Sequence, residues 1–286
     1  MRKLKIISLI ILIIFLSACS NVFVNEIHNR SINYGEITIN DLNTLTTTIV
    51  KKTRDSVIGV STYTGTSPVN LRLSGTGSGV IYECKAILKN NQVIEDCMAT
   101  QDSDDVKTYQ FKAVTNRHVI EGFYKVEVYI GQDDTFIKNV KVLYQDRKVD
   151  IALLQFEYVR PIQPIEFADS DLVEPGNIAI AIGNPYGHEF WGTATFGIIS
   201  SPKRFLSDDE NKFDDSKNEY IQHDVAINPG SSGGALLNAE GKLIGINTLK
   251  IIGEDKNERG VVVPSDGMGF SIPSNVVKEI IKRHDK

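Results

Sequence analysis

Short runs of β-branched and aromatic residues, separated by glycine, proline, asparagine and aspartate, recur along the chain from about residue 55. They cover residues 57–60, 79–82, 111–115, 126–130, 140–144, 151–156, 178–182, 197–200 and 243–248. Many short runs with turn residues between them are typical of β-sandwiches and β-barrels. Residues 160–164 hold Pro161 and Pro164, which cannot donate to a sheet, so this segment connects two sets of strands. We therefore predict an all-β fold built from two sets of similar size.

Two short helices are predicted outside these runs. Residues 41–54 carry apolar side chains at helical spacing behind Asn40 or Asp41 as N-cap, and residues 274–283 do so behind Ser274. The polar residues 83–110 and the acidic residues 207–219 interrupt the strand pattern and are predicted to be insertions.

The N-terminal residues have the pattern of an export signal. A basic start precedes an apolar run, residues 6–16, which is shorter than the ~20 residues that cross a bilayer. Small residues then lead to Cys19. This resembles the bacterial lipoprotein signal, in which Cys19 becomes the diacylated first residue and carries palmitate or a similar chain. We expect residues 1–18 to be a signal peptide and residues 19–40 a polar tether. A plainly cleaved signal and an uncleaved anchor helix are the alternatives.

The composition excludes several classes of function. With 41% hydrophobic residues the chain is able to bury a core. Without residues 1–18 it has 28 basic against 36 acidic residues, a net charge of −8. Such a chain is a poor partner for nucleic acid, and the acyl group must supply its membrane contact. No zinc-type spacing of cysteine and histidine occurs, so we expect neither a metal nor a cofactor.

Cysteine usage agrees with export. Of three cysteines, lipid would consume Cys19 and leave Cys84 and Cys97 where disulfides persist. Between these two, residues 86–88 and 92–94 flank a polar turn and predict a hairpin. Cysteines near its base would face each other, so we expect a disulfide. Two unpaired thiols in a mobile insertion are the alternative.

The strongest chemical signal is the glycine-rich run of residues 228–236. Glycines on both sides of a serine allow successive backbone N–H groups to converge on one point. A nucleophilic serine needs such a group of donors, because acyl transfer places negative charge on the carbonyl oxygen of the intermediate. A simple turn between two strands is the alternative.

A nucleophilic serine also needs a base and a group that orients the base. Of the five histidines, His118 lies just beyond an apolar strand, where it is held rigidly. A hydrogen-bonded core histidine is the alternative. Asp150 heads an apolar run that predicts burial on both faces, so its carboxylate must be paired; a turn residue that starts a strand is the alternative. The order His118, Asp150, Ser232 fits a catalytic triad.

The sequence resembles the HtrA branch of the trypsin-like serine proteases over residues 45–282. The similar segments are residues 75–80, 115–120, 150–154, 181–187, 197–200, 221–236 and 267–273. The resemblance implies a chymotrypsin-like double β-barrel, with the active site between the barrels. The backbone N–H groups of Gly230 and Ser232 would form the oxyanion hole.

The same resemblance implies a domain organisation. A protease domain would span residues 41–286, with barrel 1 at about 55–160, barrel 2 at about 175–272 and a C-terminal helix at 274–283. Relatives usually continue into PDZ domains, and we expect none here. Trimers are common in the family, so a homo-oligomer such as a trimer is left open.

The sequence departs from the family at Ser231, at His223 and at Arg117, which replaces an alanine or asparagine and is expected to be exposed at a strand edge. Ser231 replaces an asparagine or aspartate, but the Gly-x-Ser-Gly-Gly pattern selects Ser232 as nucleophile. His223 replaces a threonine and is expected to be a solvated loop residue; a role in tuning the specificity pocket is the alternative. Ala226 stands where an aspartate would pair with a substrate cation, which argues against cleavage after Lys or Arg. Asn247 and Thr248 are expected to line the same pocket.

The resemblance implies an extracytoplasmic serine endopeptidase of the cell envelope, lipid-anchored to a membrane. Its polypeptide substrates would be misfolded or damaged envelope proteins. A catalytically weak surface binding protein or chaperone-like protein on the same fold is the alternative. Calcium binding by residues 207–219 is a third hypothesis, but their spacing fits no EF-hand and a solvated acidic loop is expected.

Overall fold

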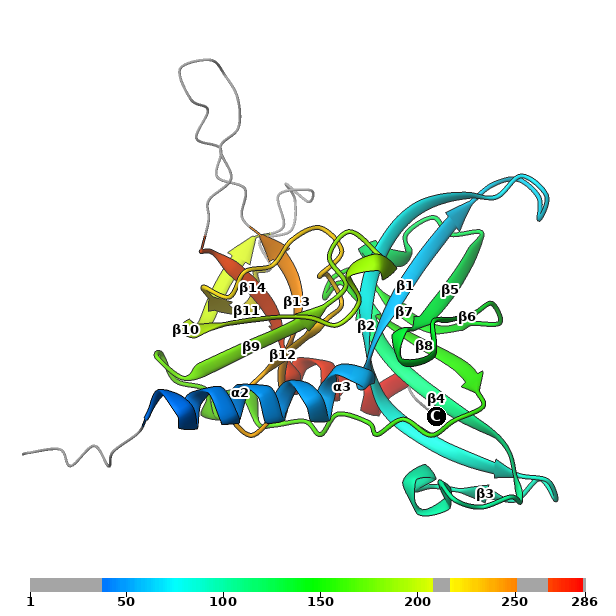
Figure 1. The fold of residues 1–286 in the computed structure, drawn as a ribbon. Coiled ribbons are helices and arrows are strands. Elements are labelled where there is room, and N and C mark those ends of the chain that lie inside the picture. Colours follow the sequence, from blue (N-terminus) through cyan, green and yellow to red (C-terminus); the bar gives the residue numbers. More distant parts are fainter. Residues whose placement is uncertain (1–37, 208–216, 251–266, 285–286) are drawn as a thin grey trace, which may run out of the picture. The chain divides into compact units, whose positions relative to one another are not determined.

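The computed structural model describes residues 38–207, 217–250 and 267–284 (Figure 1). The predicted signal peptide, nearly all of the tether and the acidic residues 208–216 lie outside the described residues. All strands belong to one compact unit that begins at Thr44. Within the described parts of the chain, no helix is both long and apolar enough to cross a membrane.

The first set of strands forms an eight-stranded antiparallel sheet, the first barrel (Figure 1). Its strands are β1 Val57–Thr64, β2 Arg72–Leu88, β3 Val93–Ile94, β4 Val106–Asn116, β5 Lys125–Ile130, β6 Thr135–Ile137, β7 Lys141–Asp146 and β8 Ile151–Tyr158. Their order is β6-β5-β1-β2-β4-β8-β7, and β3 pairs with β2. The edge strands β6 and β7 do not pair with each other, so hydrogen bonds leave this barrel open.

The second set forms a closed antiparallel barrel, the second barrel (Figure 1). Its strands are β9 Ile178–Gly183, β10 Thr193–Ser207, β11 Lys217–His223, β12 Ala235–Leu237, β13 Leu243–Lys250 and β14 Gly269–Pro273. Their order is β10-β11-β14-β13-β12-β9, and β9 pairs back onto β10. The all-β prediction is therefore confirmed.

Helices α2, Ile39–Thr53, and α3, Ser274–His284, lie close to the predicted bounds, but their caps differ. Thr38 caps α2 in place of Asn40 or Asp41. Its Oγ1 accepts the backbone N–H of Asp41 at 3.2 Å, and the Asp41 carboxylate accepts the backbone N–H of Thr38 at 2.8 Å. The hydroxyl of Ser274 donates instead to the Ala168 carbonyl at 2.9 Å, so it holds α3 against the segment that precedes the second barrel.

Three groups of buried apolar side chains hold the strands together. One fills the first barrel, where the rings of Phe111 and Phe156 stack with their centroids 5.3 Å apart. A second fills the second barrel. The third, the interbarrel core, joins residues such as Val114 and Leu153 to Ile182 of the second barrel. Residues 151–154 of β8 alternate between the third and first groups, so this half of the strand is buried on both faces.

β2 and β3 form the predicted hairpin. Its turn is closed by the N–H of Leu88, which donates to Gln92 O at 2.9 Å. Cys84 and Cys97 are joined by a disulfide with Cα atoms 5.6 Å apart. Both cysteines are buried within the core of the first barrel, so the bond belongs to the core and not to a mobile insertion.

His223 is fully buried, so the expectation of a solvated loop residue is wrong. Its Nε2 lies 3.0 Å from Ser271 Oγ, whose hydroxyl donates to Asn247 Oδ1 at 2.9 Å. Because Ser271 gives its one hydrogen to Asn247, Nε2 of His223 carries the proton. Its Nδ1 has no hydrogen-bond partner among the described residues. Burial lowers the pKa of His223 to about 4.

Reduction of the buried disulfide should lower the free energy of unfolding by ~3 kcal/mol, because the bond restricts the unfolded chain. Urea unfolding of oxidised and reduced protein measures the loss, and hydrogen exchange should rise in the β2–β3 hairpin. Intact mass after alkylation without reductant is the control. Two alkylated thiols on freshly exported protein would contradict the pairing.

Acidification from pH 7 to pH 4 should destabilise the fold through His223. The folded pKa is about 4 and the unfolded value is 6.5, so the unfolded state binds more protons in this window. Stability therefore falls as pH falls, by about 3 kcal/mol at pH 4. His223→Gln, whose amide is able to donate to Ser271 but does not titrate, should lose less. An equal loss in the two proteins by urea unfolding would refute this assignment.

Candidate active site

His118 and Asp150 lie at the same end of neighbouring strands. β4 ends at Asn116, and a short 3-10 turn, His118–Ile120, follows it. Antiparallel pairing sets Asn116 opposite Ile151, the first residue of β8. Asp150 directly precedes that residue, so strand register brings the two predicted groups together.

Asp150 holds His118 at two points. Its Oδ1 accepts the backbone N–H of His118 at 2.8 Å, and its Oδ2 lies 2.7 Å from Nδ1 of the ring. An ionised carboxylate only accepts hydrogen bonds, so Nδ1 carries the proton and Nε2 is left as an acceptor. The His118 side chain is 42% exposed and that of Asp150 is 24% exposed. The imidazole is therefore oriented yet open to solvent.

The backbone of Asp150 is itself held in an uncommon conformation. Its φ is +61°, in the left-handed region that aspartate tolerates better than most residues. Its carbonyl accepts from the N–H of Arg117 at 3.1 Å and from Nδ2 of the buried Asn116 at 3.0 Å. These bonds direct the carboxylate toward His118.

Thr248 brings the second barrel to the same carboxylate. Its Oγ1 donates to Asp150 Oδ2 at 3.0 Å. Thr248 is predicted from the sequence to line a substrate pocket, and in the structure its hydroxyl contacts Asp150, the partner of His118. The two residues are 98 positions apart, and no local pattern signals the contact.

Hydrogen bonds to carbonyl groups fix the turn around Ser232. The N–H of Tyr186 donates to Pro229 O at 2.8 Å, and that of Gly234 donates to Ser231 O at 3.0 Å. In a trans peptide the N–H points away from the C=O, so the N–H groups of Gly230 and Ser232 point away from these contacts. Neither N–H has a hydrogen-bond partner in the described part of the chain. Both donors are thus free to bind a negative oxygen.

Two glycines are required for this turn. Gly230 has a φ of +98° and Gly233 a φ of +83°. A Cβ on Gly230 would press on the backbone of Asn184 and Tyr186, and one on Gly233 would strike the Ser78 carbonyl. The sequence pattern Gly-x-Ser-Gly therefore reflects steric need.

The half-buried Ser232 donates its hydroxyl to the Thr248 carbonyl at 3.2 Å. Among the described residues it makes no hydrogen bond to His118. The three residues predicted to form a triad are therefore gathered around Thr248. Only the His118–Asp150 pair of the three is directly bonded.

Ala226 and Asn247 line one small cavity beside the Ser232 turn, together with Thr195 and Ser231. Its volume is about 20 Å³, room for about one water molecule. Asn247 is fully buried, and its Nδ2 donates to Ala235 O at 2.9 Å. A substrate pocket at Ala226, Asn247 and Thr248 stays a prediction, and residues 251–266, which follow β13, lie outside the described residues.

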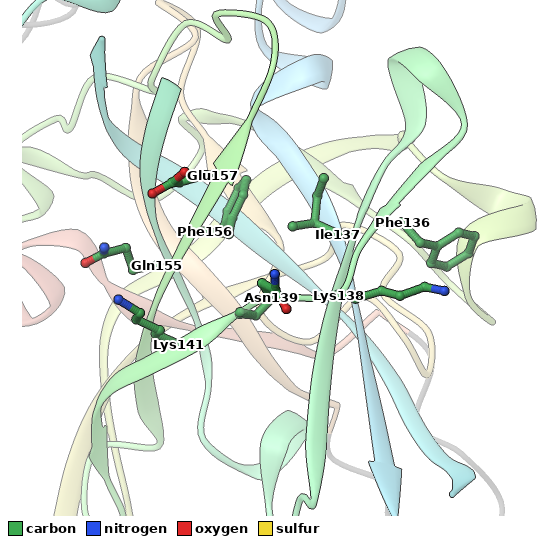
Figure 2. Close-up of a pocket in the computed structure, with 9 residues that line it drawn as sticks. Phe136, Ile137, Lys138, Asn139, Lys141, Gln155, Phe156 and Glu157 are labelled. Carbon is green, nitrogen blue, oxygen red and sulfur yellow. The ribbon is translucent and has the colours of Figure 1, made fainter. Parts of the chain in front are cut away.

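A much larger cavity lies elsewhere among the described residues. It has a volume of about 800 Å³ and opens between β6, the link to β7, and β8 (Figure 2). Figure 2 shows Ile137, Gln155 and Phe156 among its lining residues, none of which belongs to the predicted triad. In the described part of the chain, no three His, Cys, Asp or Glu side chains gather as a metal site requires. Cys19 lies outside the described residues.

Known proteins are similar in sequence to more than half of this chain. The chain is 40% identical to the serine protease Do-like HtrA of Lactobacillus helveticus over 174 residues, 59% of this chain and 40% of that protein. It is 33% identical to the protein of the same name from Lactococcus lactis over 277 residues, 91% of this chain and 61% of that protein.

A third relative is the probable periplasmic serine endoprotease DegP-like of Rickettsia prowazekii. It is 39% identical over 173 residues, 60% of this chain and 31% of that protein. The chain thus spans less than two thirds of the length of each of these relatives. Residues 77–246 match the trypsin-like peptidase domain, more than half of the chain. This segment carries His118, Asp150 and Ser232, and Thr248 lies two residues beyond it. The chain belongs to the family of trypsin-like peptidases.

Proposed function

We propose that the protein is a serine endopeptidase in which His118, Asp150 and Ser232 act as a triad. Ser232 Oγ turns from the Thr248 carbonyl to Nε2 of His118, which takes the hydroxyl proton. The oxygen bonds to the scissile carbonyl carbon, and the N–H groups of Gly230 and Ser232 stabilise the negative oxygen. His118 then protonates the leaving amine as the C–N bond breaks. Water hydrolyses the acyl-enzyme by the same route.

The single observation that carries this proposal is the geometry of the His118–Asp150 pair. Nδ1 of His118 lies 2.7 Å from Asp150 Oδ2. A neutral imidazole that donates Nδ1–H to this carboxylate presents Nε2 as the proton acceptor. Thr248 supports the arrangement, because its bond to Asp150 fixes the carboxylate from the opposite barrel. Asp150 stabilises the imidazolium when it forms.

The location and substrates extend this proposal. The export pattern before Cys19 and the printed name of the Rickettsia relative, which includes "periplasmic", support an extracytoplasmic enzyme of the cell envelope. A lipid on Cys19 would anchor it to a membrane. The substrates would be unfolded or damaged envelope proteins, and a homo-oligomer such as a trimer agrees with the resemblance to HtrA proteases.

Ser232→Ala should reduce peptidase activity by at least ~10³-fold, because the variant keeps the fold but loses the nucleophile. Ser231→Ala is the matched control. It removes a neighbouring hydroxyl that accepts one long hydrogen bond, from the N–H of Asn228 at 3.3 Å. Because little is lost, this variant should retain most activity. Cleavage of unfolded casein and labelling by a fluorophosphonate measure both variants.

If the protein is instead a binding or chaperone-like protein, the same assay should give a different result. A wild-type protein that is folded, binds unfolded casein and resists the fluorophosphonate would refute the proposed enzyme. Labelling that survives in Ser232→Ala but is lost in Ser231→Ala would move the nucleophile by one residue.

Cys19→Ala should release the protein from membranes or leave an unprocessed precursor, because the thiol at the lipidation position is removed. Membrane fractionation with metabolic labelling by a fatty acid measures the change. Cys84→Ala is the control, since it alters a cysteine of the core and should not affect acylation. A Cys19→Ala protein that is still processed and acylated would rule out the lipoprotein signal.

A further inference from the structure

Two fully buried polar residues lie against the Ser232 turn and have no part in the chemistry above. Ser78 lies on β2 of the first barrel, and Asn184 directly follows β9 of the second. Burying a hydroxyl or an amide costs free energy unless its hydrogen bonds are made. The partners of these two groups therefore show what they are placed to hold.

The side-chain amide of Asn184 has one orientation. Its Nδ2 donates to the Ile58 carbonyl at 2.7 Å, and its Oδ1 accepts the N–H of Gly192 at 3.1 Å. Exchanging the two ends of the amide would break both bonds. Asn184 is thus fixed between the barrels.

Asn184 in turn orients the hydroxyl of Ser78. The oxygen of Ser78 accepts the backbone N–H of Asn184 at 2.9 Å and lies 3.2 Å from its Nδ2. A hydroxyl has two acceptor positions and one proton. With donors at both acceptor positions, the proton is directed to the Gly230 carbonyl, 2.7 Å away.

Ser78 holds both residues whose N–H groups are free beside the nucleophile. Its hydroxyl bonds the carbonyl of Gly230, and its backbone N–H donates to the carbonyl of Ser232 at 2.8 Å. Gly230 has no side chain to limit its rotation. Its N–H direction therefore depends on bonds to the carbonyl before it, held by Tyr186, and to its own carbonyl, held by Ser78.

We propose that Ser78 is the positioning residue of the oxyanion hole: its hydroxyl, oriented by Asn184, fixes the Gly230 carbonyl and so aims the Gly230 N–H at the substrate carbonyl oxygen. This inference rests on the proposed function, because only an acyl-transfer enzyme needs that aim. Loss of the bond leaves the nucleophile and its base in place but loosens one of the two donors that stabilise the transition state.

Ser78→Ala tests the proposal, with Thr115→Val as the matched control. Thr115 is also fully buried, and its hydroxyl donates to the Ser78 carbonyl at 2.6 Å. It packs beside Gly233 but, among the described residues, makes no hydrogen bond to the Ser232 turn. Both changes delete one buried hydroxyl from the same site. Only Ser78→Ala should slow the labelling of Ser232 by a fluorophosphonate, by ~10- to 100-fold.

A second measurement separates positioning from a general loss of structure. The peptide aldehyde acetyl-Ala-Ala-Pro-valinal forms a tetrahedral adduct with the nucleophile, whereas the matching alcohol fills only the subsites. Ser78→Ala should weaken aldehyde binding by a factor similar to the labelling loss and change alcohol binding less than about twofold. Equal weakening of the two ligands would assign Ser78 a merely structural role and overturn the proposal.

Ser78→Cys keeps the test open if the alanine variant does not fold. A thiol is a weak hydrogen-bond donor of similar size, so Ser232 of this variant should be labelled more slowly than in wild type. A folded wild-type protein that is itself not labelled would defeat the proposed function. Two outcomes would defeat the positioning role alone, provided that the wild type is labelled normally. One is an equal labelling rate in Ser78→Ala and Thr115→Val, and the other is an unchanged rate in Ser78→Cys.

Discussion

The interbarrel core is the interaction on which the site depends. Val114 and Leu153 of the first barrel pack with Ile182 and Ile246 of the second in one buried group. The proposed catalytic groups come from both barrels. The few hydrogen bonds between them are too weak to hold two barrels together. Apolar burial supplies that association, at roughly 25 cal/mol for each Å² removed from water. The polar contacts then choose one geometry among those that the packing allows.

Local sequence patterns predict the features that depend on neighbours in the chain. The continuous apolar run at β8 indicates burial on both faces, and the structure sets its residues alternately into two cores. The positions of His118 and Asp150 at strand ends follow from the same runs, because antiparallel register determines which ends meet. The glycines of the Ser232 turn are visible as a local pattern because the turn needs positive φ, although the backbone contacts that also exclude a side chain come from residues distant in the chain.

Features that depend on distant polar partners escape such reasoning. Thr248 reaches Asp150, and Ser78 reaches Gly230, across the junction of the barrels. His223 misleads for a related reason. Its place in the sequence indicates a loop, whereas β11 extends to His223 and Ser271 Oγ accepts the hydrogen bond from its Nε2–H. Small hydroxyl residues are common on strands, so nothing in the pattern distinguishes those that satisfy a buried group. Only the assembled fold identifies them.

The unclosed side of the first barrel affects how the protein behaves at high concentration. Unpaired strand edges are templates on which a second copy is able to add a strand and seed aggregation. β6 is only three residues long, and the exposed Lys138 and Lys141 follow it at the mouth of the gap (Figure 2). Charged side chains on an edge strand, lysine especially, oppose the addition of another strand. The gap therefore stays open to solvent while edge-to-edge growth of copies is disfavoured.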